Sequence, residues 1–163
     1  TAGEIGHVQL DPQGAVCRCG NPGCLDTVVG ATALIEPLRG AYGNLTLRDV
    51  IVRANDGDRG CAQVVADAGE TIGTVVAGLG VAVNPQCVVV GGELAETGEV
   101  LLGPLREAVR RRLLPNRIAP TEVVPAALGR DAEVIGAMML ALQSTDLPLG
   151  GLELPAPEPQ EVP

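Results

Sequence analysis

Residues 6–26, with the sequence GHVQLDPQGAVCRCGNPGCLD, contain the only histidine and three of the five cysteines in this 163-residue chain. Prolines and glycines are spread through the segment, and these residues favour turns over regular helices and strands. The segment is therefore predicted to be a loop. A loop of this kind needs a specific interaction to fix its conformation. That interaction restricts the fold of the chain more than any other feature of the sequence.

The spacing of the cysteines and the histidine predicts a metal site. Cys17, Cys19 and Cys24 offer three thiolates within eight residues, and His7 lies ten residues before the first of them. Zn²⁺ prefers four nitrogen or sulfur ligands in a tetrahedron. If the turn at residues 12–14 returns the chain, these four side chains form a closed, structural zinc site. Zinc binding in small sites is linked to about 10–16 kcal/mol of apparent free energy, enough to order a loop.

Two other interpretations of this loop are weaker. Solvent-facing thiols in a flexible loop would need no metal. A DNA-reading zinc finger has a cysteine pair followed by a histidine pair around a basic helix, whereas here the histidine comes first and the net charge is −9. The remaining cysteines, Cys61 and Cys87, are predicted to be small apolar residues of a helix and of a buried strand.

Composition excludes some classes of function. The apolar residues make up 46% of the chain, yet there is no Trp or Phe and only one Tyr, so the core is expected to consist of Val, Leu, Ile and Ala. A net charge of −9 disfavours binding to a nucleic-acid backbone, and one aromatic residue cannot form a base-stacking platform. Five cysteines without a secretion signal predict a reducing cytoplasm.

The pattern of apolar residues predicts an α/β fold in which helices outnumber strands. Helices are expected from Cys24 to before Pro37 and over residues 45–56, 60–83, 98–114 and 131–143. Strands are expected at residues 87–90, as a buried parallel strand, and at 118–126. So small a sheet would leave exposed edges unless other strands pair with it. Residues 148–163 are Pro-rich and acidic and predict a disordered tail.

Two segments resemble the ROK family, which includes bacterial sugar kinases and sugar-responsive transcriptional repressors. AGEIGH at residues 2–7 and CRCGNPGCLD at 17–26 match its pattern E-x-G-H followed by C-x-C-G-x-x-G-C-x-E. VNPQCVVVGGELA at 83–95 and LGRDAEVIGAMMLAL at 128–142 are similar to its nucleotide-side strand and C-terminal helix. The resemblance implies that residues 1–147 are the C-terminal sugar-binding and oligomerisation portion of an actin-like (ribonuclease H-like), two-lobed fold.

The resemblance also implies roles for individual residues. Glu4 and His7 would hydrogen-bond the hydroxyls of a sugar or sugar phosphate, and the other ring nitrogen of His7 would bind zinc. Asp26 stands where the family has a second sugar-contacting Glu, and its shorter side chain withdraws the carboxylate by about 1.5 Å. Gly91 and Gly92 would form the nucleotide-side turn. Kinases of the family commonly have a third glycine there.

At the third position of that turn this chain has Glu93, whose charge would repel a polyphosphate. This difference favours a regulator over a kinase. The leading hypothesis is the sugar-sensing portion of a ROK transcriptional regulator, forming a homo-oligomer and reaching DNA only through a segment outside this chain. The alternatives are the C-terminal half of a ROK sugar kinase, and a zinc-stapled interaction module that binds no ligand.

No catalytic residue is predicted in this chain. In ROK kinases the catalytic Asp and the phosphate loop precede E-x-G-H, as does the winged helix of the regulators. The chain begins at Thr1, which suggests a fragment without activity of its own. Neither a membrane-spanning segment nor a signal peptide is expected, because no run of eighteen apolar residues and no basic-then-apolar leader occurs.

Two motifs are interpreted as coincidental. DAGET at residues 67–71 spells the phosphate-loop pattern of actin-like ATPases, but it lies inside the strongest helical pattern rather than after a strand. The arginines at 106 and 110–112 could suggest phosphate binding. They are predicted instead to form a solvated helix face in which Glu107 pairs with Arg111.

Overall fold

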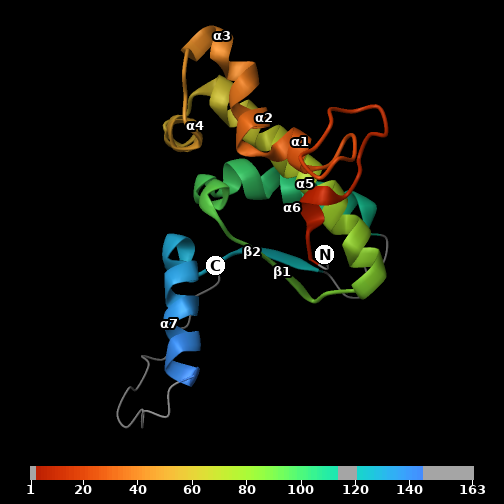
Figure 1. Ribbon diagram of the computed structural model, residues 1–163, viewed down its shortest axis with the longest axis vertical. Coiled ribbons are helices and arrows are strands. Elements are labelled where there is room, and N and C mark those ends of the chain that lie inside the picture. Colours follow the sequence, from red (N-terminus) through yellow and green to blue (C-terminus); the bar gives the residue numbers. More distant parts are fainter. Residues whose placement is uncertain (1–2, 114–120, 145–163) are drawn as a thin grey trace. The chain divides into compact units, whose positions relative to one another are not determined.

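The structure is a computed structural model that describes residues 3–113 and 121–144. It divides into two compact units, residues 1–130 and 131–163, which are described separately. The first unit contains helices, one small sheet and the cysteine-rich loop (Figure 1). The elements are η1 (Ile5–His7), α1 (Asp26–Val29), α2 (Ala31–Ile35), η2 (Glu36–Leu38), α3 (Arg39–Tyr42), α4 (Leu47–Asn55), α5 (Arg59–Val83), β1 (Cys87–Val90), η3 (Glu93–Thr97), α6 (Glu99–Arg112), β2 (Glu122–Pro125), η5 (Gly129–Asp131) and α7 (Ala132–Ser144).

The starts of α4 and α5 are fixed by side chains that cap them. Thr46 and Asp49 form a reciprocal capping box, so α4 begins within the predicted helix of residues 45–56. The Asp58 carboxylate caps α5 by accepting from the backbone N–H of Cys61 at 3.0 Å, and it also accepts from the Tyr42 hydroxyl at 2.7 Å. Both helices therefore begin where local sequence specifies.

The long helix α5 packs closely along α6 (Figure 1). A Cβ atom on Gly69 would lie 2.4 Å from the Leu101 carbonyl oxygen, and one on Gly73 would lie 2.5 Å from that of Leu105. The two backbones thus meet where α5 has no side chains. Much of the apolar core surrounds this contact, in agreement with the predicted composition: Leu38, Val50, Ala54, Cys61, Val65, Ala77, Leu101, Leu102, Leu105, Val109, Leu113 and Val123.

By length and apolar composition alone, α5 could cross a membrane. In this structure it is a core helix, with Val65, Ala68 and Ala77 buried. A central helix of a packed domain meets the same criteria. The helix also contains the DAGET segment, since residues 67–71 lie within it and the Thr71 hydroxyl donates to the Asp67 carbonyl at 2.8 Å. The motif is therefore helical, as predicted.

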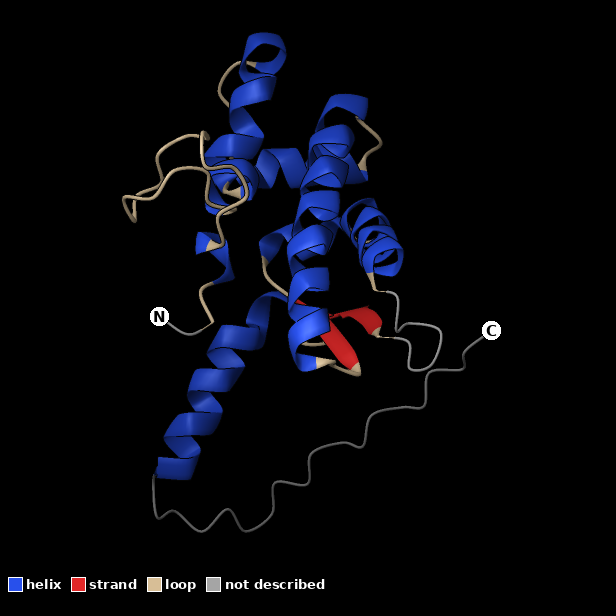
Figure 2. Cartoon of the chain, turned by 90° about the vertical axis from the view of Figure 1, so that its right-hand side faces the viewer, coloured by secondary structure: helices blue, strands red, loops and turns tan. Residues whose placement is uncertain are grey.

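The strands β1 and β2 pair in parallel, with Cys87 opposite Glu122 (Figure 2, red). The parallel pairing was predicted, but the predicted burial of β1 is wrong. Val88 and Val90 pack against the core, whereas Val89 is 62% exposed and Cys87 is exposed. Within the described residues only one face of this sheet is covered, and Cys87 is therefore not a core residue.

Three further expectations differ from the structure. The first predicted helix is broken, because Gly30 is extended between α1 and α2. Glu107 pairs with Arg110 rather than with Arg111, which reaches across to Glu70 on α5 at 2.6 Å. The second strand begins at Glu122. Residues 118–120 of the predicted strand and the predicted tail at 148–163 lie outside the described residues.

In the second unit, the structure describes Asp131, the last residue of η5, and the helix α7. The observed helix covers residues 132–144, close to the predicted 131–143. It is apolar around much of its circumference, and its large side chains are exposed within the described part of the unit: Val134, Ile135, Met138, Met139 and Leu140.

Candidate metal centre

The cysteine-rich loop is folded by a small set of backbone hydrogen bonds. The Leu25 N–H donates to the Val8 carbonyl at 2.9 Å, and the Leu10 N–H donates to the Gly23 carbonyl at 2.7 Å. A second turn closes further along the loop, where the Cys17 N–H donates to the Asn21 carbonyl at 2.8 Å. These bonds return the chain from the cysteines to η1, so that residues distant in the loop lie side by side.

Glycine is required at one crossing point of this loop. Gly23 has φ +62°, and a Cβ atom there would lie 1.7 Å from the Asp11 carbonyl oxygen. No other residue fits without moving the backbone, because 1.7 Å is far inside van der Waals contact. The backbone crossing at Gly23 places Cys24 next to η1, with the Cys24 Sγ 3.8 Å from the His7 carbonyl oxygen.

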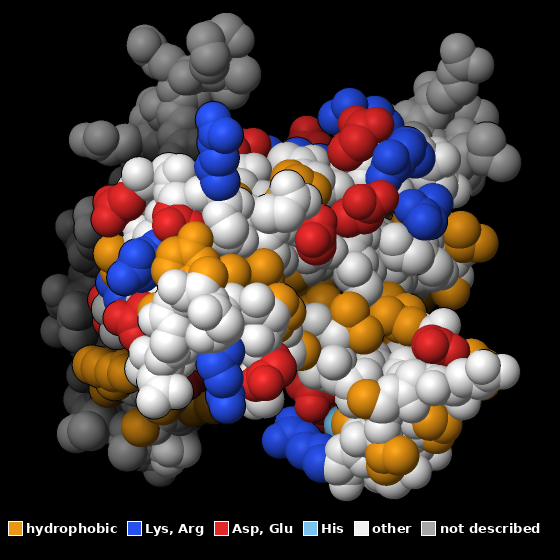
Figure 3. All heavy atoms as spheres, turned by 90° about the horizontal axis from the view of Figure 1, so that it is seen from above, with side chains coloured by type: hydrophobic (Ala, Val, Ile, Leu, Met, Phe, Trp, Pro, Cys, Tyr) orange, Lys and Arg blue, Asp and Glu red, His pale blue; other side chains and the backbone are white. Residues whose placement is uncertain are grey.

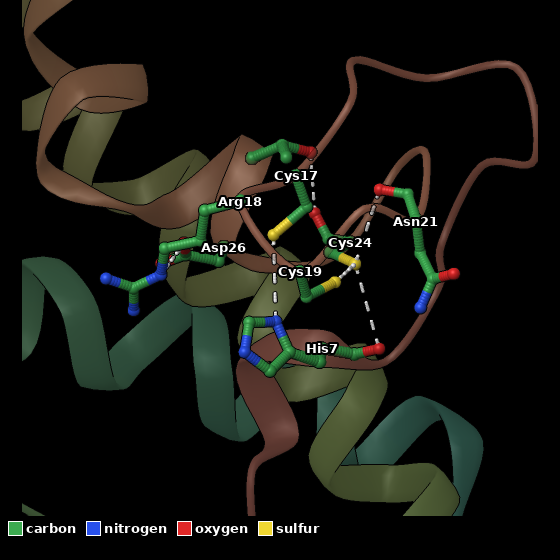
Figure 4. A network of polar contacts seen from close by, with 8 residues as sticks. His7, Cys17, Arg18, Cys19, Asn21, Cys24 and Asp26 are labelled. Atoms are coloured by element: carbon green, nitrogen blue, oxygen red, sulfur yellow. Dashed lines mark hydrogen bonds and ion pairs between the residues drawn. The ribbon is translucent and has the colours of Figure 1, made fainter.

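The loop brings together all four predicted metal ligands (Figure 4). One ligand atom from each of His7, Cys17, Cys19 and Cys24 lies within 4.8 Å of every other. The Cys17 Sγ is 3.6 Å from the His7 Nδ1, and the Cys19 Sγ is 3.6 Å from the Cys24 Sγ. Ligands around a tetrahedral Zn²⁺ with standard bond lengths stand about 3.5–3.8 Å apart, so the cluster has the size of one coordination shell.

The surroundings of the cysteines differ in exposure and in acidity. Cys17 and Cys24 are buried and Cys19 is exposed. Desolvation raises the pKa of the Cys24 thiol to about 12, and the neighbouring Cys19 and Cys17 add to the increase. A backbone hydrogen bond at Asn21 lowers the pKa of Cys19. Metal ligation requires the thiolate, so an ion bound here would displace the Cys24 proton.

The residues assigned to sugar binding lie beside this cluster. Glu4 is exposed immediately before η1, and Asp26 is the first residue of α1. A Cβ on Gly6 would lie 3.7 Å from the Asp26 Cβ, so the two segments are adjacent. His7 is half-buried, and its ring reaches the surface beside acidic and basic side chains (Figure 3, pale blue). Glu4, His7 and Asp26 thus belong to neighbouring segments next to the loop.

Sequence reasoning missed Arg18 at this site. Its Nε lies 3.8 Å from the Asp26 carboxylate, and both side chains are at the loop surface (Figure 4). Its position between two ligand cysteines did not reveal the partner, because Asp26 lies beyond the loop, in α1. The predicted nucleotide-side turn is elsewhere: Gly91 and Gly92 are exposed in the connection from β1 to η3, where Gly92 has φ +91°.

Comparison with known proteins places the chain in a family. The family model of ROK proteins matches residues 1–144. The chain belongs to the ROK family. Among curated ROK relatives, a glucokinase of Thermotoga maritima is 33% identical over 149 residues, which cover 82% of this chain and 47% of the relative. An N-acetylglucosamine repressor of Escherichia coli is 32% identical over 122 residues, covering 69% of this chain and 30% of the relative.

Solved structures of ROK proteins share the fold of this chain. A ROK glucokinase from Streptomyces griseus, in complex with glucose and AMPPNP, is 27% identical with a TM-score of 0.76 over 88% of this chain and 52% of its own. A ROK transcriptional regulator, a homologue of the Escherichia coli MLC protein, is 27% identical with a TM-score of 0.69. The match covers 77% of this chain and 34% of the regulator. The chain therefore spans about half the length of these relatives or less, and both kinases and regulators resemble it.

Proposed function

We propose that His7, Cys17, Cys19 and Cys24 hold a structural Zn²⁺ ion. The support is the donor set, one imidazole nitrogen and three sulfurs with the separations of a tetrahedral shell. Four protein ligands leave no open coordination position, so the ion would order the loop and take no part in a reaction. The backbone around Gly23 folds so tightly that it holds the ligands close together without other regular structure.

We propose further that this loop presents a sugar-binding surface. The geometry that supports it is the orientation of His7, whose Nδ1 faces Cys17 while the other ring nitrogen points away from the sulfurs (Figure 4). With Nδ1 on a metal, the neutral ring carries its proton on Nε2, which can donate to a sugar hydroxyl. The Glu4 carboxylate can accept from two hydroxyls. Asp26, one methylene shorter than Glu, would reach the sugar through a water molecule.

For the whole protein we propose the role of a sugar-sensing transcriptional regulator. The support is Glu93, which is exposed directly after Gly91 and Gly92, where a negative charge would repel a polyphosphate. A sugar or sugar phosphate would act by binding one arrangement of the protein more tightly than another. Homo-oligomerisation, and contact with DNA through a segment outside this chain, belong to the same proposal.

The second candidate is the sugar-binding part of a ROK kinase. The likeness to glucokinases favours it, since the Streptomyces griseus enzyme has the TM-score of 0.76. In that case the same residues would orient a sugar hydroxyl, and Gly91 and Gly92 would lie near the nucleotide. The two candidates share the sugar site and differ at the turn that contains Glu93.

One calorimetric series tests the sugar site. The zinc-loaded chain is titrated with glucose, xylose, N-acetylglucosamine and the 6-phosphates of the two hexoses, and Glu4→Gln is compared with the exposed control Glu36→Gln. Because a hydrogen bond to a charged group contributes about 1.5–3 kcal/mol, Glu4→Gln should weaken binding by about 10-fold or more. The control should bind normally. Absence of heat with every sugar, at one zinc per chain, would contradict sugar binding and support a zinc-stapled interaction module.

A nucleotide titration separates the regulator from the kinase. The sugar-saturated protein is titrated with a non-hydrolysable ATP analogue, alongside Glu93→Gly. A regulator should show no binding in the unsubstituted chain. Binding of the analogue to that chain would refute the regulator and support the kinase, whereas binding only in Glu93→Gly would show that the carboxylate excludes the nucleotide.

A further inference from the structure

Two of the four candidate ligands form a sulfur pair that differs in access to solvent. The Cys19 Sγ and the Cys24 Sγ are 3.6 Å apart. Cys19 is exposed, whereas Cys24 is fully buried with 0% of its surface accessible. A reagent in solution can therefore reach one sulfur of the pair directly and the other only through its neighbour.

Of the other cysteines, Cys17 also lies near this pair, with its Sγ within 4.8 Å of the sulfurs of Cys19 and Cys24. The Cys17 Sγ faces the His7 ring, with its Sγ 3.6 Å from the Nδ1. Cys61 is buried in the core beside Val50 and Val65. Cys87 is exposed at the start of β1. The exposed Cys19 thiol therefore has two thiols nearby, and it lies 3.6 Å from that of Cys24, whereas Cys17 faces the imidazole.

The chain between these cysteines is a tight turn with a fixed path. The Gly20 N–H donates to the Cys17 carbonyl at 2.9 Å, and Gly20 and Gly23 both have positive φ, +92° and +62°. A disulfide needs an S–S separation of about 2.05 Å, so the two sulfurs must approach by about 1.5 Å. Rotation of the exposed Cys19 side chain can supply most of this movement, because no packing holds it.

We propose that Cys19 and Cys24 are a peroxide-sensitive modification site, at which oxidation forms a disulfide and releases the bound metal. The Cys19 thiolate attacks hydrogen peroxide, the O–O bond breaks, and a sulfenic acid forms with loss of hydroxide, which leaves as water after protonation. The Cys24 sulfur then attacks the Cys19 sulfur, and the second oxygen leaves as water. Two thiols and one peroxide give one disulfide and two waters, a two-electron oxidation.

Oxidation would change more than the metal. Two of the four ligands are lost, and His7 and Cys17 alone do not fill a zinc shell. Cys24 lies two residues before α1, and the Leu25 N–H donates to the Val8 carbonyl. Release of the ion would therefore loosen the contact between η1 and the start of α1, where His7 and Asp26 lie. The inference rests on the two sulfurs and holds whichever sugar the protein binds.

Peptide mapping identifies the pair, because the chain has no lysine and trypsin cleaves after Arg18 and next after Arg39. The zinc-loaded chain is treated with hydrogen peroxide, zinc release is followed with a chromogenic chelator, and free thiols are alkylated before digestion. We expect release of about one zinc per chain and a peptide 19–39 that carries an internal disulfide and no alkyl group. Dithiothreitol should restore zinc binding.

The alternatives give different peptides. A bond to Cys17 would join peptide 1–18 to peptide 19–39 and would overturn the proposal. So would zinc release accompanied only by sulfinic or sulfonic acid at Cys19, or no zinc release at all. Cys87→Ser is the matched control, since it removes an exposed thiol outside the loop and should leave the response unchanged. A Cys87→Ser variant that no longer releases zinc would also refute the assignment.

Discussion

At the scale of single residues, Gly23 is the position in the candidate site where a side chain is least tolerated. The Asp11 carbonyl oxygen would lie 1.7 Å from a Cβ there, so Gly23→Ala must move the backbone that places Cys24. Gly20 has a positive φ too, but nothing lies within 4 Å of its Cβ position. Gly20→Ala should therefore cost only about 1 kcal/mol of conformational strain.

We expect Gly23→Ala to lower zinc affinity by at least 100-fold and Gly20→Ala by less than 10-fold. Competition with a fluorescent zinc chelator measures both. Equal affinities in the two variants would show that the loop tolerates displacement at Gly23, contrary to the geometry.

The Asp58 carboxylate makes the start of α5 sensitive to pH. Hydrogen bonds from the Cys61 backbone and from Tyr42 lower the pKa of Asp58. A carboxylate with a lowered pKa in the folded state contributes stability above its unfolded pKa of about 4, and this contribution is lost as the pH falls through the folded value. Asp58→Asn keeps a capping oxygen but removes the charge.

We expect Asp58→Asn to be less stable than the unsubstituted chain at pH 7, with the difference shrinking as the pH falls below about 4. Urea unfolding at several pH values measures it. The matched control is Asp56→Asn, an exposed aspartate just before it. A constant difference across the pH range would mean that the charge of Asp58 does not stabilise the helix.

The sequence predicted that His7, Cys17, Cys19 and Cys24 come together, because these residue types are chemically distinctive and close in the chain. Arg18 was missed because an ion pair between exposed side chains leaves no pattern of spacing. The pairing of Arg111 with Glu70 was missed for a related reason. Glu70 lies on α5, whereas Glu107 lies on α6 together with Arg111, at a spacing that favours an ion pair.

At the scale of elements, the α5–α6 contact depends on glycine. Gly73→Ala would place a Cβ 2.5 Å from the Leu105 carbonyl oxygen, and the two helices would have to separate. Gly78, on the same helix, has nothing within 4 Å of its Cβ position, so Gly78→Ala should gain helix propensity alone.

We expect Gly73→Ala to lower the free energy of unfolding by about 1–3 kcal/mol, and Gly78→Ala to raise it by up to about 1 kcal/mol. Chemical denaturation of the zinc-loaded chain measures both. If both variants proved more stable, the close approach of α5 to α6 would be wrong.

Helix positions were predictable because caps and apolar periodicity are local. Thr46 and the periodic pattern of residues 60–83 specify α4 and α5 without knowledge of the rest of the fold. The break at Gly30 and the exposure of Val89 were not predictable in this way. Both depend on what packs against the segment, and an apolar run such as residues 87–90 does not say which of its faces is covered.

At the scale of the whole molecule, the sheet face that the described residues of the first unit leave uncovered is expected to promote association between chains. Val89 is 62% exposed on a parallel sheet, a type of sheet that is usually covered on both faces. Val88 packs against the core on the other face.

We expect Val89→Lys to increase the monomeric fraction in sedimentation without loss of stability. Val88→Lys, the control on the opposite face, should unfold the first unit. If Val89→Lys left the self-association of the chain unchanged, this face of the sheet would not be the surface through which the chains associate.

The sequence identifies the family because the Cys/His pattern is rare and its spacing is strict. It does not separate regulators from kinases, since a glucokinase is 33% identical and a repressor 32% identical to the chain. The proposal of a regulator therefore depends on Glu93, in the short turn after β1.

The close backbone contact at Gly69 and Gly73 also limits the relative motion of α5 and α6. Two helices without intervening side chains cannot slide or pivot without steric collision, so α5 and α6 should move as one rigid body. Flexing would then fall on the connections at their ends, where Asn84, Gly92 and Gly98 already have positive φ. Amide hydrogen exchange should be slowest along the α5–α6 seam and markedly faster at these three hinges.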